Sequence, residues 1–148
     1  MSKLEHVPFE TTLLVRDTCL CLHVQRAARA LARRFDEALR PFDLTNGQFS
    51  LIMSLNRPAP PSMGSVAALL VMDRTTLTAA LKPLERRGLV EITVDPDDRR
   101  SRLLTLTAPG QALLARAVPI WEQTHAAVEA QLPGTDPARL RDDLRALA

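Results

Sequence analysis

Three arginines stand within four positions of the chain, and this spacing suits contact with an anionic polymer. Arg99, Arg100 and Arg102 close the stretch 95–102, in which acidic and turn-forming residues precede them. Guanidinium groups pair with phosphate oxygens and are attracted into a narrow DNA minor groove. Such a cluster is more often an ordinary solvated loop, so it indicates nucleic acid only in a suitable structural context.

A second set of polar residues lies where a helix is expected to begin. Asp73 is a typical N-cap residue, and the positions after it are polar or basic. An arginine here can pair with a guanine edge or a phosphate, and hydroxyl groups can reach bases or phosphates. The alternative is an ordinary capped helix start. The side chains that we expect to face DNA are Arg74, Thr75, Thr76, Thr78 and Lys82.

Two cysteines and a histidine raise the question of thiol or metal chemistry. Cys19 and His23, four positions apart, share one face of a helix and could form a partial metal site or a thiol tuned by an imidazole. The pair supplies too few ligands for a closed zinc site. Cys19 and Cys21 point in nearly opposite directions on a helix and cannot bond to each other within the chain. Structural cysteines are favoured, and a thiol-based redox or metal-responsive regulator using Cys19 and Cys21 is the alternative.

The remaining composition argues against an enzyme and against a membrane protein. There is no nucleophile–base spacing and no glycine-rich phosphate loop, and the 3 histidines form no metal set, so neither a cofactor nor a metal is expected. A chain of 148 residues that is 46% hydrophobic favours one folded domain over disorder, while the net charge of +2 discriminates little. No apolar run is long enough for a membrane span and no signal peptide is recognisable, which predicts a cytoplasmic protein without a membrane partner.

The periodicity predicts a mainly α protein with one small β-hairpin. One long helix is expected over about 12–40, because apolar residues recur there at steps of three and four. Alternating residues predict strands over 90–94 and 103–107. Thr45 and Gln48 match a capping box. The residues expected to cap or end the other helices are Ser62, Asp73, Gly88, Thr107 and Asp136.

The order of the central elements favours a winged helix-turn-helix. Two short helices joined by a tight turn precede a hairpin with a long charged tip. In such a domain the second helix enters the major groove by its N-terminal end, which suits the polar residues after Asp73, and the hairpin presents arginines to the DNA backbone. The alternative is a winged-helix protein-interaction module, in which the same loop is merely solvated.

The residues of this central region resemble the DNA-binding core of the MarR family of bacterial transcriptional regulators. The helices before and after it also follow the plan of that family. The resemblance is carried most specifically by Leu84-Glu85, Gly88-Leu89-Val90, Asp98-x-Arg100 and Leu106-Thr107-x-x-Gly110.

The resemblance implies a homodimer whose two winged domains bind a palindromic operator in double-stranded DNA. Residues 41–107 would form the DNA-binding domain, and residues 1–40 and 108–148 the helical dimerisation region. Arg100 would be the wing arginine that enters the minor groove. Asp98 would orient it or a neighbouring arginine without touching DNA.

Two positions depart from the pattern of the family. Many members have a glycine in the turn before the recognition helix, where this chain has Val71. A branched side chain tolerates a left-handed backbone poorly, so the turn must take another shape or carry strain. Many members also have an arginine shortly after the Gly-Leu-Val run, where this chain has Ile92, and one phosphate contact per subunit would be missing.

The C-terminal helix gives an independent reason to expect a dimer. Leu140, Leu144 and Leu147 would be hard to bury in so small a monomer, and a partner chain would supply the missing surface. The alternative is that they fold back on the preceding long helix.

Members of the family typically respond to a small molecule, often aromatic or phenolic, and the resemblance implies a repressor that such an effector releases from DNA. The candidate pocket residues come from three helices, and ordinary core packing is the alternative for each of them. They are Cys19, His23, Phe49, Met53 and Trp121.

Overall fold

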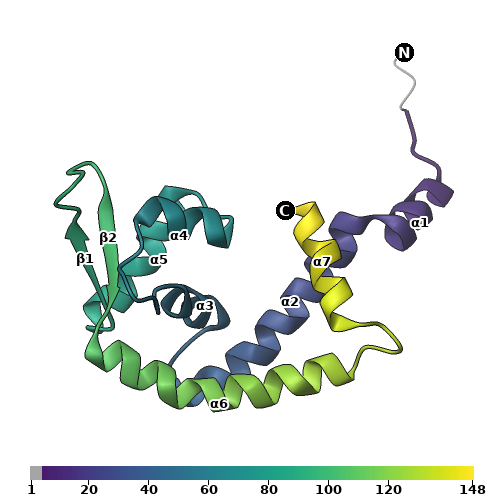
Figure 1. Ribbon diagram of the computed structural model, residues 1–148. Helices are drawn as coiled ribbons and strands as arrows, with labels where there is room; N and C mark the ends of the chain where they lie inside the picture. Colours follow the sequence, from purple (N-terminus) through teal and green to yellow (C-terminus); the bar gives the residue numbers. More distant parts are fainter. Residues whose placement is uncertain (1–4) are drawn as a thin grey trace. The chain divides into compact units, whose positions relative to one another are not determined.

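The computed structural model describes residues 5–148, which divide into two compact units, residues 5–34 and 35–148. Seven α-helices, one short 3₁₀ helix and a two-stranded hairpin make up the described chain, in agreement with the predicted mainly α class (Figure 1). None of the helices in this part of the chain has an apolar stretch that could cross a membrane.

The first unit contains α1 (Phe9–Thr18) and the greater part of α2 (Leu20–Leu39), so the single helix expected over 12–40 is wrong. The break lies at Cys19, whose ψ of 110° is extended. Its sulfur accepts the backbone N–H of Leu22 at 3.4 Å, as the side chain of an N-cap residue does. The hydroxyl of Thr18 donates to the carbonyl of Leu14 at 2.6 Å, a local bond that competes with a continued helix.

Capping side chains start the α-helices of the second unit as the sequence predicts. Helix α3 (Asn46–Ser54) follows the 3₁₀ turn η1 (Arg40–Phe42) and opens with the complete capping box of Thr45 and Gln48. Ser62 accepts the N–H of Ser65 at the start of α4 (Met63–Leu70). The remaining caps are Asp73 for α5 (Arg74–Arg86), Thr107 for α6 (Ala108–Ala130) and Asp136 for α7 (Pro137–Leu147).

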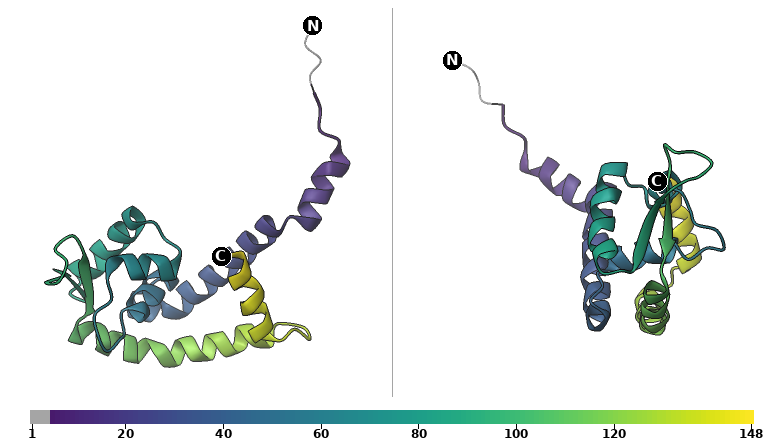
Figure 2. Two further views of the ribbon diagram at one scale, coloured as in Figure 1. Left: turned by 45° about the horizontal axis from the view of Figure 1, so that its top comes forward. Right: turned by 90° about the vertical axis from the view of Figure 1, so that its left-hand side faces the viewer.

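Strands β1 (Val90–Val94) and β2 (Arg102–Leu106) pair antiparallel, with Val90 opposite Leu106 and Val94 opposite Arg102. The second strand begins and ends one residue earlier than predicted, because Thr107 serves as the cap of α6. Its hydroxyl donates to the Gly88 carbonyl at 2.6 Å and accepts the N–H of Gly110 at 3.1 Å. Figure 2 shows the loop between the strands projecting away from the helices of the winged domain.

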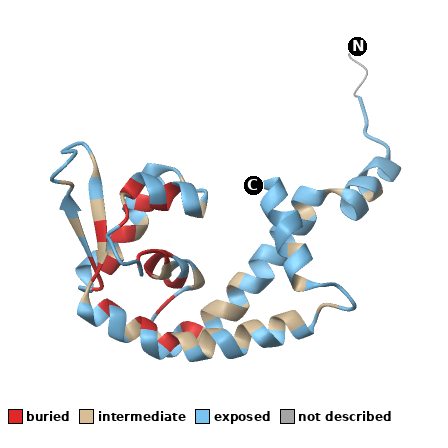
Figure 3. Cartoon of the chain, viewed as in Figure 1, coloured by how far each residue is buried: buried red, intermediate tan, exposed pale blue. Residues whose placement is uncertain are grey.

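The buried core of the second unit lies under α3, α4, α5 and the hairpin, and the first half of α6 closes it (Figure 3). Gly110 permits the close approach of α6, because a Cβ atom there would lie 2.3 Å from the carbonyl oxygen of Leu89. Ile92 is half-buried and packs against this core. The fully buried large side chains are Leu39, Leu51, Ile52, Val66, Leu77, Leu81, Leu84 and Leu104.

Helix α7 contributes nothing to this core, although all of its residues are described. None of them is buried, and Leu144 and Leu147 are 43% and 64% exposed. Arg141 ties the helix to α6 through a 2.8 Å ion pair with Glu129. Leu140 is half-buried, so α7 contacts the long helix of the same chain at its first turn and leaves Leu144 and Leu147 largely exposed.

Candidate nucleic-acid interface and ligand pocket

The exposed face of α5 gathers most of the residues expected to face DNA. Arg74, Thr75, Thr78 and Lys82 line one hollow on the protein surface together with Ala79. Their spacing places them on one side of a helix, while the inner side carries fully buried leucines. The hollow therefore presents two cationic and two hydroxyl side chains along the first two and a half turns of the helix.

The hydroxyls of this helix differ in what they already bind. Thr76 donates to the Asp73 carboxylate at 2.9 Å and lies outside the hollow, so it completes the cap. Thr78 donates to the Arg74 carbonyl at 2.7 Å and retains acceptor capacity. Hydrogen bonds from the backbone and hydroxyl of Thr76 lower the pKa of Asp73. The carboxylate thus stays ionised at the N-terminus of α5, where it offsets the positive end of the helix dipole.

The loop between the strands, residues 95–101, is shaped by its own acidic side chains. The carboxylate of Asp95 accepts the N–H of Asp97 at 2.9 Å, and that of Asp98 accepts the N–H of Arg100 at 3.1 Å. Asp98 therefore acts on the backbone of Arg100, and among the described residues no ion pair joins it to an arginine side chain.

The two arginines of the loop and Arg102, the first residue of β2, have different surroundings. The guanidinium of Arg102 donates to the carbonyls of Arg99 and Ser101 at 3.1 and 3.3 Å, so it folds back onto the loop. Arg99 and Arg100 are exposed, and the described residues offer neither of them an ion pair. Within this loop the geometry leaves Arg99 and Arg100 as the two extended cationic groups.

The turn between α4 and α5 resolves the question raised by the missing glycine. Val71 adopts φ 53° and ψ 47°, the left-handed conformation that a glycine would adopt at no steric cost. The N–H groups of Val71 and Met72 donate to the carbonyls of Ala68 and Ala67, which closes the end of α4. The turn keeps the shape suited to glycine and carries the strain of a branched side chain.

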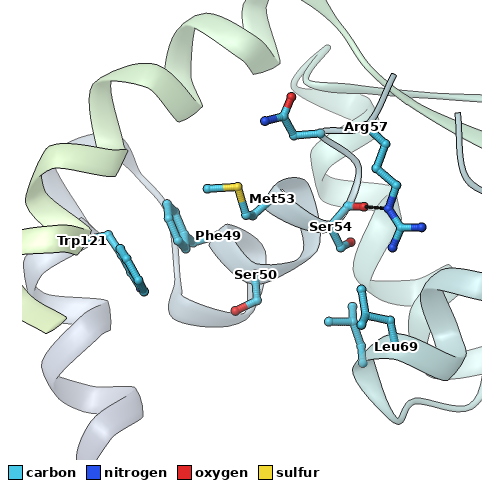
Figure 4. Close-up of a pocket in the computed structure, with 9 residues that line it drawn as sticks. Phe49, Ser50, Met53, Ser54, Arg57, Leu69 and Trp121 are labelled. Carbon is cyan, nitrogen blue, oxygen red and sulfur yellow. Dashed lines mark hydrogen bonds between the residues drawn. The ribbon is translucent and has the colours of Figure 1, made fainter. Parts of the chain in front are cut away.

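Three of the five candidate effector residues line one cavity of 480 Å³ in the second unit. Phe49 and Met53 come from α3 and Trp121 from α6 (Figure 4). No sequence pattern marks the residues of the remaining wall: some lie in α3 or directly after it, and others reach it only through the tertiary fold. Those residues are Ser50, Ser54, Asn56, Arg57, Leu69 and Leu70.

An aromatic stack forms one side of this cavity. The rings of Phe49 and Trp121 lie 6.1 Å apart at an interplanar angle of 15°, and Trp121 stacks on His125 at 4.7 Å and 14°. A second cavity of 220 Å³ shares Phe49 and Trp121 and includes His125. Both rings therefore combine core packing with cavity lining, so the two interpretations of these residues are compatible.

Cys19 and His23 belong to the first unit, and the effector role proposed for them stays a prediction. His23 Nδ1 lies 2.8 Å from the Cys19 carbonyl oxygen, so this ring nitrogen bonds to the backbone and not to the thiol. The sulfur of Cys21 accepts a hydrogen bond from Gln25 at 3.1 Å. In the described part of the chain, no three His, Cys, Asp or Glu side chains are grouped to hold a metal.

Comparison with known proteins places this geometry among transcriptional regulators. The model of the MarR family matches residues 44–101. Transcriptional regulator HosA from Escherichia coli O111:H- is 33% identical over 95 residues, which cover 64% of this chain and 70% of HosA.

Two solved structures match over most of their length. The transcriptional regulator MosR of M. tuberculosis in complex with DNA has a TM-score of 0.80 and 40% identity, covering 88% of this chain and 93% of MosR. CouR from Rhodococcus jostii RHA1 bound to p-coumaroyl-CoA has a TM-score of 0.76 and 25% identity, covering 88% and 92% of the two chains.

Proposed function

The chain belongs to the MarR family of transcriptional regulators, and from this premise we propose that it is a dimeric, sequence-specific DNA-binding repressor. It binds a palindromic operator, and a small aromatic ligand releases it. The observation that carries the proposal is that α5 and the hairpin loop of one compact unit both present exposed cationic side chains. The related MosR was solved with DNA, which supports the same partner here.

In the proposed complex each protomer holds DNA at two places. The N-terminal end of α5 enters the major groove, where Arg74 and Thr75 reach base edges or phosphates and Lys82 pairs with a phosphate. Arg100 enters the minor groove, whose negative potential attracts it. Arg102 shapes the loop, since its guanidinium binds the loop carbonyls.

The dimer is proposed to form through residues 1–40 and 108–148, and the winged domain to comprise residues 41–107. The exposed leucines of α7 support this division, because a partner chain would remove their apolar surface from water. Twofold symmetry would set two half-sites about one helical turn, roughly 10 base pairs, apart.

Release by a ligand requires that the ligand bind more tightly to a dimer whose recognition helices do not fit the operator. The cavity beside Phe49, Met53 and Trp121 supports such a site, since its 480 Å³ lies in the size range of small-molecule pockets. That CouR was solved with p-coumaroyl-CoA supports a small-molecule effector in a related chain.

The test is retardation of the DNA fragment upstream of the protein's own gene, measured with excess non-specific competitor. Arg100→Ala is expected to weaken binding by about 1–3 kcal/mol, roughly five- to 150-fold. Arg139→Ala, which removes an exposed arginine of α7, is the matched control and should bind as the wild type does. If Arg100→Ala binds the DNA fragment with wild-type affinity, Arg100 of the hairpin loop has no part in DNA binding. Failure to retard any promoter fragment would favour the protein-interaction module.

Thiol regulation is the second candidate, and the geometry of Cys19 favours it. The cysteine sits where α1 ends, and its half-buried sulfur accepts an N–H at the start of α2, so a change at the thiol would act directly on this break. Peroxide should then weaken DNA binding of the wild type and leave a Cys19→Ser variant unaffected. An identical response of both proteins, or none in either, would exclude sensing through Cys19.

A further inference from the structure

We propose that Arg87 is a positioning residue for DNA binding, which holds the end of the recognition helix α5 against the η1 turn and so sets the half-site spacing that a dimer accepts. The inference rests on the proposed repressor function and adds to it the residue that fixes the angle of α5. Arg87 is not among the side chains expected to face DNA, because it stands at the end of the helix, directly before Gly88.

The helices and strands of the second unit approach one another in two sets. Helix α5 comes close to α4 and β1, and β2 joins this set through its pairing with β1 (Figure 1). Helix α3 comes close to α6 instead. Both sets share one buried core, to which α5 contributes Leu77, Leu81 and Leu84. The core therefore holds α5 up to Leu84, and the residues after it at the end of the helix are exposed.

A polar hollow of 460 Å³ lies between the end of α5 and the turn that leads into α3. Of the described residues that line it, only Leu44 and Pro83 are apolar, so hydrophobic contact does little to hold its two sides together. The polar residues that line it are Asp36, Arg40, Asp43, Thr45, Gln48 and Arg87.

Arg87 bridges this hollow with directed hydrogen bonds. Its Nη1 donates to the carbonyl oxygen of Asp43 at 2.6 Å, and its Nη2 donates to that of Phe42 at 3.4 Å. Because a guanidinium is planar, two bonds from one group fix the direction of the partner as well as its distance. The Asp43 carboxylate lies 4.0 Å from Nη2 and is 95% exposed, so this ion pair adds little to the two bonds.

The η1 turn that accepts these bonds is also held from the side of α6. The guanidinium of Arg116 lies 5.6 Å from the centre of the Phe42 ring, which is a cation–π distance. Phe42 therefore contacts α6 with its side chain and Arg87 with its carbonyl oxygen. Asp36 accepts the N–H of Asn46 at 2.6 Å, which joins the helices on either side of the turn. Outside the shared core, Arg87 thus links the set that contains α5 with the set that contains α6.

The link bears on DNA binding because a dimer reads two half-sites at a fixed separation. Arg87 and Arg74 stand at opposite ends of α5, about 20 Å apart at 1.5 Å per residue. Over this length, a tilt of about 10° displaces one end relative to the other by about 3.5 Å, which is one base-pair step. Bonds that fix the end of the helix therefore fix where its DNA-binding end lies.

The first experiment measures the position of α5 in the full-length protein without DNA. Nitroxide labels are attached to Ala79→Cys on the exposed side of α5 and to Ala115→Cys on α6, after Cys19 and Cys21 have been replaced by serine. Pulsed electron paramagnetic resonance gives the distribution of the distance between the two labels. An excess of unlabelled protein restricts the measurement to labels within one chain.

Arg87→Gln is expected to broaden this distribution, and Arg87→Lys, which keeps one charged donor group, to restore part of the wild-type width. Arg86→Gln removes the neighbouring exposed arginine and should leave the distribution unchanged. Thermal unfolding shows that each variant is folded, which the buried leucines of α5 lead us to expect.

The second experiment measures affinity for the DNA fragment upstream of the protein's own gene, in which nuclease protection locates the half-sites. Inserting one base pair between them moves one half-site by about 3.4 Å and turns it by about 35°. The wild type should then lose affinity about tenfold or more, whereas Arg87→Gln should bind the original fragment more weakly and lose only about threefold or less on insertion.

The proposal is overturned if Arg87→Gln keeps the wild-type distance distribution, or if the insertion weakens its binding as much as that of the wild type. A wild type that binds no upstream fragment would contradict the repressor function and with it the role of Arg87 in spacing. The label distances are measured without DNA, so a failure of the repressor function is distinguishable from a failure of the link between α5 and η1.

Discussion

Val71 holds a left-handed backbone at the turn that leads into α5, and its side chain gains little in return because it is 72% exposed. For a residue other than glycine this conformation costs about 1–2 kcal/mol. A glycine would remove that cost and would add about 0.5–1 kcal/mol of chain entropy to the unfolded state. The two terms leave a small net stabilisation in favour of glycine.

We therefore predict that Val71→Gly raises the free energy of unfolding by about 0.5–1 kcal/mol, as measured by chemical denaturation. Val71→Ala is the matched control, since it loses the branch and keeps the Cβ atom that makes the left-handed conformation costly. If the denaturant concentration at the unfolding midpoint is no higher for Val71→Gly than for Val71→Ala, the turn carries no such strain.

Asp36 supplies a pH-dependent contact between α2 and α3. Its carboxylate accepts the backbone N–H and the side-chain amide of Asn46 at 2.6 and 2.8 Å, and these bonds lower its pKa below the ordinary value of 3.8. Because the Asp36 carboxylate binds a proton less tightly in the folded state than in the unfolded state, its hydrogen bonds stabilise the fold at pH values above the ordinary pKa. This stabilisation disappears as the pH falls through the lowered pKa of the folded state.

Asp36→Asn is accordingly expected to cost about 1 kcal/mol at pH 6, with the difference from the wild type shrinking as the pH falls below about 3.8. Urea unfolding at a series of pH values measures this. Glu37→Gln removes a neighbouring carboxylate that makes only an exposed 3.5 Å pair with Arg40, and it should show little pH-dependent difference. If the free energy of unfolding of Asp36→Asn differs from that of the wild type by the same amount at all pH values, the stabilisation does not come from the ionised carboxylate.

At the scale of single residues, the sequence predicts those hydrogen bonds that depend only on residues close together in the chain. Thr45, Ser62 and Asp73 cap their helices because a hydroxyl or carboxylate three positions ahead of an N–H needs no tertiary context. Arg57 could not be found in this way, since its place in the cavity depends on α4 and α6 lying beside α3.

At the scale of elements, α7 differs from the other α-helices of the second unit in having no buried residue. Leu140, Leu144 and Leu147 recur at steps of four and three, which places them on one side of the helix. The prediction of this helix and of its exposed apolar side needed only periodicity. The interruption at Cys19 was missed because no proline or glycine marks it, and only local hydrogen bonds separate α1 from α2.

If α7 contributes to a dimer interface, Leu144→Glu should convert the protein largely to monomer at micromolar concentration. Two leucines and their packing, one from each copy, account for about 3 kcal/mol or more of the association free energy. Sedimentation equilibrium measures the mass directly. Ala138→Glu adds the same charge to a position of α7 turned away from the leucines and should remain dimeric. A wild type that sediments as a monomer would contradict the dimer, and a Leu144→Glu variant with the mass of a dimeric wild type would contradict the contribution of α7 to it.

At the scale of the whole molecule, a net charge of +2 conceals a separation of charges within the winged domain. Asp73, Asp95 and Asp98 bind backbone N–H groups, so they shape a helix start and a loop, whereas Arg74, Lys82 and Arg100 extend from the same elements toward solvent. The fold class followed from the order of the elements. The cavity did not, because its walls come from segments up to about seventy positions apart in the chain.

The central claim is that Arg74, Lys82 and Arg100, which are exposed in each of two protomers, bind the phosphate backbone of DNA. The most direct measurement is the affinity of the protein for the DNA fragment upstream of its own gene, determined by fluorescence anisotropy at salt concentrations from 50 to 200 mM. A dimer that neutralises six or more phosphates should lose affinity on the order of a thousandfold over this range, because each neutralised phosphate releases a counterion. An affinity that stays flat across the same salt range would contradict the claim.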